Sequence, residues 1–439
     1  MTDTAILVIS ALLVFAYLLD VMGGRFKVPS VVLLIGSGIL ARLLLDRIGI
    51  KLQFVETYVP LIGTLGLILI VLEGALDLEI RRDRAGLIAR ASTAALAGFW
   101  LCLLAFAWLL MRLLDFAPAT AALIAIPFAV ISSAVAIPST RGLAQETREF
   151  VTYESALSDI LGVLVFYAWL AAQGSMETFL GDLFSGAIIS LAIAVLAALA
   201  VFYLINRLEG HVRFLPVLAV LALLYAAGKQ LHLSPLILVL VCGLLLNNPQ
   251  LLEWNARLRE MHGLDYDQTL KEFKGVVAEL TFATKSFFFL MLGYWTDLSY
   301  MADQRAWLIA IVMVAVIYLT RIAILSVLRL PDRIRLLWLA PRGLITVLLF
   351  LIAFEGMDRH SFLIGTVMLV VLSTSAITAL SHRGITDEPS RKTSARNETA
   401  TKNTNGNGGS DAAAPSGNGT EGTERPAKAH AAPARRDHH

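Results

Sequence analysis

The chain has 439 residues, of which 57% are hydrophobic and only 16% are charged, and its formal net charge is +2. Its mean hydropathy of +0.71 is too high for a soluble domain, which could not bury so much apolar surface. The small net charge gives no support to nucleic-acid binding. Composition therefore predicts a polytopic membrane protein.

Cysteine, histidine and N-terminal patterns exclude several other classes. Cys102 and Cys242 both lie in apolar runs, where we expect small core residues rather than a disulfide. The first residues, MTDTAIL, lack the basic region and cleavage site of a signal peptide, so we expect the first apolar segment to be retained. The histidines have neither metal-ligand nor catalytic-triad spacing, so we expect no enzymatic activity and no cofactor.

The apolar segments are long enough to cross a membrane, which takes about 20 residues. We identify thirteen of them: 4–22, 28–46, 58–76, 91–113, 119–137, 154–173, 181–206, 213–228, 231–247, 275–296, 306–328, 334–354 and 361–381. The division between the eighth and the ninth rests on Gly228-Lys229-Gln230 and Ser234-Pro235. The sequence thus predicts an all-α fold with about 13 transmembrane helices.

Basic residues are concentrated in one set of alternate loops. This set comprises residues 25–27, 81–90, 141–148, 207–213, 257–274 and 329–335. Basic loops stay on the cytoplasmic side of a membrane. We therefore expect the N-terminus outside the cell and the C-terminus in the cytoplasm, in the inner (plasma) membrane.

Residues 382–439 differ from the rest of the chain. They are rich in Ser, Asn, Gly, Thr and Ala and contain almost no large apolar residue. Such a segment cannot offset its ordering entropy by burial. The sequence therefore predicts a membrane domain over residues 1–381 and a disordered cytoplasmic tail over 382–439.

Asp159 is a carboxylate beside the apolar run ILGVLVFYAWLAA of residues 160–172. Its charge costs roughly 2.5 kcal/mol or more at bilayer depth, so we expect it to face a wet cavity and to bind a proton or a small cation. The hydroxyl groups of Ser155 and Ser158 are suited to a hard cation such as Na⁺. Glu154 lies about 140° from Asp159 around a helix, which predicts different roles for the two carboxylates.

Other charged residues also lie in apolar segments. Arg321, in IYLTRIAIL, cannot lose its charge and needs an acidic partner, for which we choose Glu154. Lys285 lies in LTFATKSFFFLMLG and Glu73 ends the third segment. Glu73 is interpreted either as a functional carboxylate or as a structural ion-pair partner, and Lys285 as a supporting charge.

Two segments contain a point where a helix is weakened. Arg342 lies between Pro341 and Gly343, and the fifth segment contains Ser132 followed by Ser133. Free carbonyls and amides at such breaks can line a cavity. The two weak points correspond if segments 4–6 and 11–13 are inverted repeats, as in many secondary transporters. We therefore expect two broken helices that cross near the membrane midplane, with both serines beside the cation.

These motifs resemble the monovalent cation/proton antiporter superfamily, nearest to bacterial sodium/proton exchangers with a thirteen-helix core. ESALSD (154–159) is similar to the family's E-S-L-L-N-D element, whose final aspartate binds the transported ion. TRIAILSV (320–327) is similar to the helix whose arginine pairs with the glutamate of that element. PRGLITVLLFL (341–351), LSPLILVLVCGLLLNN (233–248) and KSFFFLMLG (285–293) are similar to further family segments. The resemblance covers about residues 1–381.

The resemblance implies a secondary transporter that exchanges monovalent cations, with Na⁺ as the first choice, for protons. With Asp159 as the one shared site, one proton would exchange for one cation and transport would be electroneutral. It also implies a homodimer. In that dimer an ion-binding bundle, about residues 91–173 and 306–381, moves against a dimerisation scaffold.

The chain departs from the family pattern at two places. Ser158 stands where the family has asparagine, and the fifth segment has no counterpart of the aspartate in T-D-P, whether 132–134 or 129–131 is matched to it. The gated K⁺-efflux branch also lacks that aspartate, so a K⁺/H⁺ antiporter or a K⁺-efflux system remains an alternative. Two alternatives of other classes are a transport-inactive membrane sensor or scaffold and an organic-anion symporter of the bile-acid type.

Overall fold

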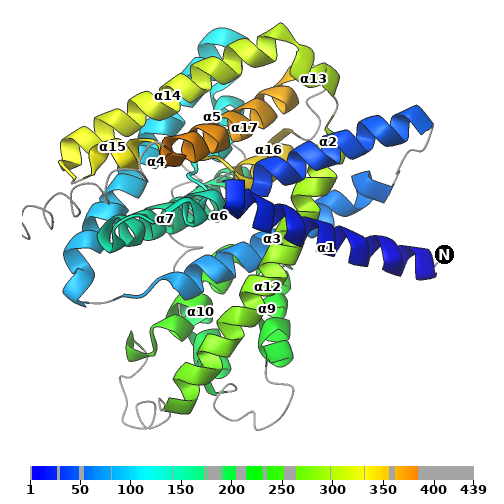
Figure 1. Ribbon diagram of the computed structural model, residues 1–439. Coiled ribbons are helices and arrows are strands. Elements are labelled where there is room, and N and C mark those ends of the chain that lie inside the picture. Colours follow the sequence, from blue (N-terminus) through cyan, green and yellow to red (C-terminus); the bar gives the residue numbers. More distant parts are fainter. Residues whose placement is uncertain are drawn as a thin grey trace, which may run out of the picture. The chain divides into compact units, whose positions relative to one another are not determined.

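The computed structural model describes residues 2–26, 30–48, 54–80, 82–140, 142–172, 175, 189, 191–203, 214–230, 235–251, 264–296, 298–330, 332–354 and 361–383. These residues all belong to the first of two units into which the chain divides, Met1–Thr386. Except for residues 382 and 383, the predicted tail lies outside the described residues. Every regular element in the described part is a helix (Figure 1).

The helices follow the predicted segments. Their bounds are α1 Thr2–Phe26, α2 Ser30–Ile48, α3 Phe54–Asp77, η1 Arg82–Arg84, α4 Ala85–Leu114, α5 Pro118–Ala129, α6 Ser133–Ala136, η2 Pro138–Thr140, α7 Gln145–Ala171, α9 Phe214–Gln230, α10 Pro235–Asn247, η3 Pro249–Leu251, α12 Leu264–Trp295, α13 Leu298–Ala302, α14 Gln304–Leu328, α15 Arg333–Leu337, α16 Leu344–Phe354 and α17 Phe362–Arg383. A further apolar helix, Leu191–Tyr203, corresponds to part of the seventh segment. The rest of that segment lies outside the described residues, apart from residue 189.

Several helices have the length and composition of membrane spans. Within the described residues six qualify: Ala85–Leu114, Pro118–Ala136, Gln145–Ala171, Tyr266–Trp295, Gln304–Leu328 and Phe362–Ser381. Shorter apolar helices accompany them, including Pro235–Asn247 and Leu344–Phe354. The predicted all-α, multi-pass membrane fold is confirmed, while the number thirteen stays a prediction.

Two helices begin well before the segments predicted for them. α7 begins at Gln145 instead of residue 154, and α12 begins at Leu264 instead of residue 275. The first turns of both helices are rich in charged residues, which a search for apolar runs leaves out. As a result Glu154 and Asp159 lie in the middle of α7, and Lys274, which was assigned to a loop, lies on α12.

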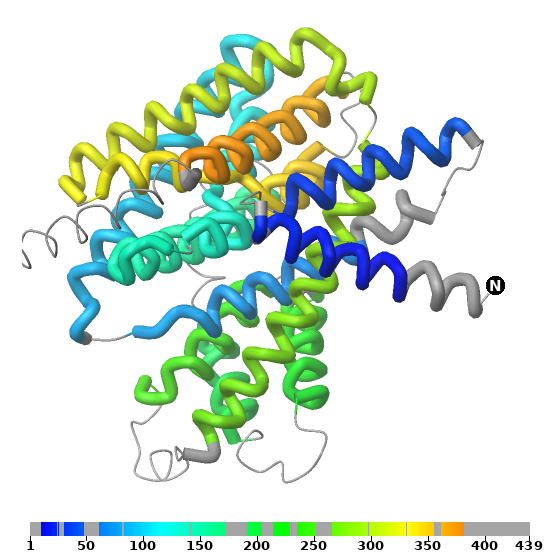
Figure 2. Tube along the Cα trace, viewed as in Figure 1, coloured from blue at the N-terminus to red at the C-terminus, as the bar shows by residue number. Residues whose placement is uncertain are grey.

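The helices pack into two groups that share α7. In the first group, α4 packs against α5, α7 and α14, and α14 packs against α17 (Figure 1). In the second group, α12 packs against α2 and α3, whose tubes it crosses in Figure 2, and α10 packs on α3 and α9. Since α7 also contacts α3 and α10, it lies at the boundary between the groups.

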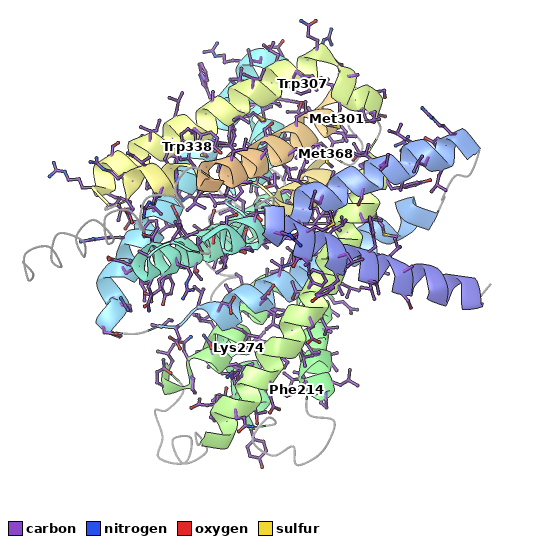
Figure 3. All side chains as sticks on the ribbon, in the orientation of Figure 1. Phe214, Lys274, Met301, Trp307, Trp338 and Met368 are labelled. Carbon is purple, nitrogen blue, oxygen red and sulfur yellow. The ribbon has the colours of Figure 1, made fainter. Side chains whose placement is uncertain are left out.

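Side chains of the first group separate into an apolar interior and an apolar surface. Met368 of α17 is fully buried, whereas Trp307 of α14 is half exposed (Figure 3). The lipid chains of a bilayer are as apolar as such a surface, so exposed apolar side chains fit a membrane-spanning bundle. Both cysteines are free and buried, as expected from the sequence.

Both predicted helix breaks are present. Pro127 lies inside α5, where its missing N–H and its ring weaken the last turn, and the chain is extended at Val130 before α6 begins at Ser133. The second break lies between α15, which ends at Leu337, and α16, which begins at Leu344. The non-helical stretch between them contains Pro341-Arg342-Gly343, as predicted.

Candidate functional site

The two helix breaks are in direct contact. The backbone N–H of Ser132 donates a hydrogen bond to the carbonyl oxygen of Pro341 at 2.9 Å. Gly343 packs on Ser132 so closely that a Cβ added to the glycine would lie 2.7 Å from the serine Cβ. Real Cβ atoms do not approach other atoms this closely, so the contact requires glycine at this position.

Asp159 of α7 lies against the break that precedes α6. Its Oδ2 accepts a hydrogen bond from the backbone N–H of Ser133 at 3.0 Å. Its Oδ1 is buried without a hydrogen-bond partner, and the side chain is only 5% exposed. A buried carboxylate oxygen without a partner is costly. A proton or a metal cation would satisfy it.

The serines of α7 make different contacts from each other. The Oγ of Ser158 accepts a hydrogen bond from the backbone N–H of Ile131 at 2.9 Å, so this hydroxyl holds the broken segment in place. The hydroxyl of Ser155 donates to the carbonyl of Val151 within its own helix at 2.7 Å. Ser155 lies one turn before Asp159, on the same side of α7.

Glu154 and Arg321 form the ion pair that the sequence predicted. The guanidinium of Arg321, on α14, donates from both terminal nitrogens to the two carboxylate oxygens of Glu154. Its Nε donates to the carbonyl of Leu336 at 3.1 Å. The side chains are 5% and 1% exposed. Among the acidic side chains of the described residues, those of Glu154 and Asp159 are buried. Asp159 is therefore the buried carboxylate of the described residues without an ion-pair partner.

Arg342 lies in the second break and is 1% exposed. Its Nη1 donates to the carbonyl of Val130 at 2.8 Å, and its backbone N–H donates to the hydroxyl of Thr374 at 3.0 Å. Its Nη2 is 3.9 Å from the Sγ of Cys102, and its Nε has no hydrogen-bond partner. Val130 lies three residues before Ser133, whose N–H binds Asp159, so the guanidinium and this carboxylate contact the same short break. This side chain thus ties the two breaks together.

Glu73 and Lys285 lie together, away from the contact between the two helix breaks. The Nζ of Lys285 on α12 is 4.0 Å from Oε2 of Glu73 on α3, and both side chains are partly exposed. This contact favours the ion-pair interpretation of Glu73. The structure therefore brings Asp159, Ser133 and Ser158 to the break, and it places this pair in the second group of helices.

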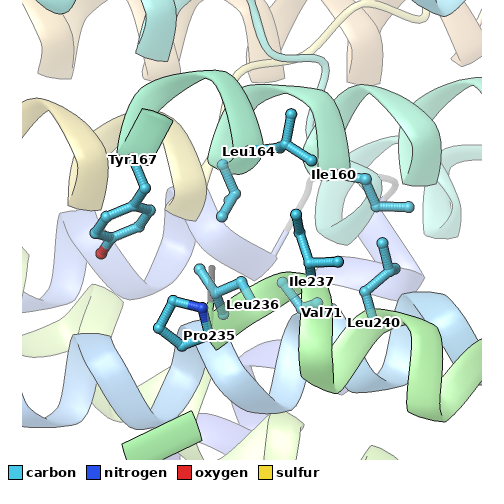
Figure 4. Close-up of a pocket in the computed structure, with 9 residues that line it drawn as sticks. Val71, Ile160, Leu164, Tyr167, Pro235, Leu236, Ile237 and Leu240 are labelled. Atoms are coloured by element: carbon cyan, nitrogen blue, oxygen red, sulfur yellow. The ribbon is translucent and has the colours of Figure 1, made fainter. Parts of the chain in front are cut away.

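Two cavities lie along α7, one before Asp159 and one after it. The first is polar, with a volume of about 200 Å³, and is lined by Asp77, Glu79, Arg84, Arg148, Glu149, Thr152, Tyr153 and Lys274. The second is apolar, with a volume of about 20 Å³, and is lined by Val71, Ile160, Val163, Leu164, Tyr167, Pro235, Leu236, Ile237 and Leu240. Figure 4 shows Ile160, Leu164 and Tyr167 of α7 pointing toward the residues of α10. Along α7 the polar cavity thus lies on the N-terminal side of Asp159, and the apolar cavity lies on its C-terminal side.

Some contacts of the site were not anticipated from the sequence. Thr374 and Cys102 contact Arg342, although they lie far from it in sequence and carry no charge that would mark them. Asn247 and Asn248 both donate to the carbonyl of Leu78 beyond the end of α3, at 2.9 and 2.8 Å. Two adjacent asparagines at the end of an apolar run are the signal that could have indicated this cap.

The transmembrane sodium/hydrogen exchanger family matches residues 9–385 of the chain. The chain belongs to this family. Its fold is similar to the structure at pH 8 of the sodium proton antiporter MjNhaP1 from Methanocaldococcus jannaschii, with a TM-score of 0.69 and 19% identity over 86% of this chain and 96% of that one. An electron-microscopy structure of the same antiporter gives a TM-score of 0.65 and 19% identity over 88% and 99% of the two chains. A comparison with curated proteins gives no match.

The family assignment confirms the resemblance inferred from the sequence motifs. This exchanger is a multi-pass membrane protein whose family exchanges cations for protons. The solved structures, at 19% identity, show the shared fold.

Proposed function

We propose that this exchanger binds Na⁺ and protons in turn at Asp159 and exchanges one proton for one Na⁺. The observation that carries the proposal is the unpartnered, buried Oδ1 of Asp159 beside the crossing of two broken helices. The other buried carboxylate of the described residues, Glu154, is held by Arg321. With one carboxylate available, each cation displaces one proton and transport is electroneutral.

The oxygen atoms around Asp159 suit a hard cation. Ser133 lies in direct contact with the carboxylate, and Ser132, Ser155 and Ser158 add hydroxyl oxygens on the surrounding elements. Hard cations prefer oxygen ligands. The remaining charges, Glu154, Arg321, Arg342, Glu73 and Lys285, support the fold around the site.

The proposed transport cycle moves the ion-binding bundle, residues 91–173 and 306–381, against the remaining helices, through which two copies form a homodimer. Exchange is coupled because the bundle moves its binding site from one side of the membrane to the other when Asp159 carries a proton or a cation. A bare carboxylate in a low-dielectric environment is the penalised state. α7 belongs to the bundle and contacts α3 and α10 of the other group. The movement therefore takes place along the surface that α7 presents to these two helices.

The two cavities along α7 suggest the side from which Asp159 is reached. Arg84, Arg148 and Lys274 line the polar cavity, and basic residues mark the cytoplasmic face. We therefore assign the polar cavity to the cytoplasm and the apolar cavity to a seal on the outer side. This orientation places the N-terminus outside and the C-terminus inside, in the inner (plasma) membrane.

K⁺ is the second candidate cation. The observation that favours it is the break before α6, which carries Ser132 and Ser133 and no second carboxylate. A site with one carboxylate binds a cation less strongly than a site with two, and weaker binding reduces the advantage of the smaller ion. The two candidates are separated by the order in which cations activate exchange.

The test is the dissipation of a pH gradient in proteoliposomes by Na⁺, Li⁺ and K⁺. Wild type is compared with Asp159→Asn and with the control Asp46→Asn, which makes the same change at an exposed position of α2. The Na⁺ and Li⁺ measurements are repeated with valinomycin and equal K⁺ on both sides, which removes any membrane potential. We expect Na⁺ to dissipate the gradient in wild type and Asp46→Asn, unaffected by valinomycin, and to have no effect in Asp159→Asn.

Three results would contradict the proposal. Exchange in Asp159→Asn would show that another group carries the ions. Dissipation that depends on the valinomycin clamp would exclude one-for-one exchange. Failure of every cation in wild type would favour a sensor or an organic-anion symporter, and a response to K⁺ alone would select the second candidate.

A further inference from the structure

Arg342 is the largest fully buried side chain of the described residues, and it carries a permanent charge. Its guanidinium makes one short hydrogen bond, to the carbonyl of Val130, and its Nε makes none. Within the described part of the chain, no carboxylate oxygen lies within 4.0 Å of it. A buried arginine without an acidic partner is an expensive arrangement.

The other buried arginine of the bundle shows the contrast. Arg321 donates from both terminal nitrogens to Glu154, which neutralises its charge. The polar side chains at the break facing Arg342 are those of Ser132 and Ser133, and the break contains no acid. Arg342 binds this break at the carbonyl of Val130, and Asp159 binds it at the N–H of Ser133, three residues further along. The charge of Arg342 therefore acts on the carboxylate of Asp159.

The other charged groups described near α7 are either paired elsewhere or exposed. α7 packs against α3, α4, α5, α6, α10, α16 and η2. Among the charged side chains that the structure describes on these elements, Glu73 and Asp77 of α3 face Lys285 and Lys274, and Arg90 and Arg112 are at exposed positions of α4. Of those bound to α7 from other elements, Arg84 pairs with Glu149, Arg321 pairs with Glu154, and Asp332 accepts a hydrogen bond from Thr147. None of them substitutes for Arg342 as the cation beside Asp159 in the described structure.

We propose that Arg342 is a positioning residue that competes electrostatically with the transported cation for Asp159, and so sets the cation affinity and the working pH of this exchanger. The inference rests on the proposed role of Asp159. A fixed positive charge near a carboxylate stabilises its ionised, empty form and weakens the binding of both Na⁺ and protons. Removing one such charge is expected to tighten binding on the order of tenfold.

The test measures cation binding without transport. Purified protein in detergent is titrated with Na⁺, Li⁺ and K⁺ at several pH values, and the thermal midpoint of unfolding reports binding. Arg342→Gln removes the charge and Arg342→Lys keeps it, while Ser133→Asp leaves the arginine in place and adds an acid to the break. Arg112→Gln, at an exposed position near the end of α4, is the matched control.

We expect Arg342→Gln and Ser133→Asp to bind the cation roughly tenfold more tightly than wild type. In proteoliposomes the pH of half-maximal exchange should move upward by about one unit in both variants, because the proton is also held more tightly. Arg342→Lys and Arg112→Gln should retain wild-type midpoints.

A purely structural role for Arg342 gives a different result. Arg342→Gln would then yield less folded protein or a lower maximal rate, with an unchanged cation midpoint and pH profile, and this outcome overturns the inference. If Arg342→Gln does not fold, unchanged binding in Ser133→Asp overturns it. If no cation stabilises wild type in a manner that depends on Asp159, the proposed function fails and this inference falls with it.

Discussion

Replacing Glu154 with glutamine removes one half of a buried ion pair. Arg321 would retain the carbonyls of Leu336 and Leu339, at 3.1 and 3.4 Å, but its charge would persist because guanidinium does not deprotonate. Removing one partner of a buried pair costs about 3–5 kcal/mol, since it leaves an uncompensated charge. We therefore expect Glu154→Gln to lower the free energy of unfolding by about that amount.

A partly exposed ion pair made by another glutamate of α7 provides the matched control. The Nε of Arg84 lies 3.4 Å from Oε2 of Glu149, and the side chains are 37% and 24% exposed. Exposed ion pairs contribute about 0–1 kcal/mol. Glu149→Gln makes the same chemical change on α7, so the difference between the two variants isolates the effect of burial.

The assay is unfolding in mixed detergent micelles with increasing SDS, followed by circular dichroism. The double variant Glu154→Gln/Arg321→Met is expected to recover much of the stability lost in Glu154→Gln. The reason is that replacing a buried ion pair by uncharged or apolar groups is often neutral. Equal losses in Glu154→Gln and Glu149→Gln would refute the reasoning. Equal losses would show that the buried pair contributes no more to the free energy of unfolding than the partly exposed pair.

Gly343→Ala is expected to abolish exchange, because its new Cβ would lie 2.7 Å from the Cβ of Ser132 at the crossing. Gly98→Ala, whose added Cβ would meet nothing within 4 Å, is the control in the same proteoliposome assay, and wild-type exchange in Gly343→Ala would contradict the close packing. Leu164→Asn is expected to increase the passive Na⁺ leak of proteoliposomes, because a polar side chain in the apolar cavity admits water. Leu170→Asn, on an exposed part of the same helix, should not leak, and equal leaks in the two variants would argue against the seal.

Local chemistry made part of the site predictable from the sequence. The break at Pro341-Arg342-Gly343 follows from residues that weaken a helix wherever they occur. The partnership of Glu154 and Arg321 follows from the cost of an unpaired buried charge. Both features depend on rules that hold without knowledge of the fold.

Other features depend on three-dimensional packing and could not be predicted. The partner of the Arg342 side chain is a backbone carbonyl, that of Val130, and no side-chain pattern marks a carbonyl as a partner. Of the serines placed beside the cation, Ser158 binds the broken segment and Ser155 binds its own helix. The early start of α7 was missed because its first turns are polar.

The central claim is that a proton and a cation compete for Asp159. It is tested most directly by isothermal titration of the purified protein with Na⁺ in two buffers of different ionisation enthalpy, which counts the protons released. The account predicts that release approaches one proton per bound cation in wild type at the acidic end of the working range, with no binding in Asp159→Asn. Na⁺ binding without proton release, or equal binding in Asp159→Asn, would contradict it.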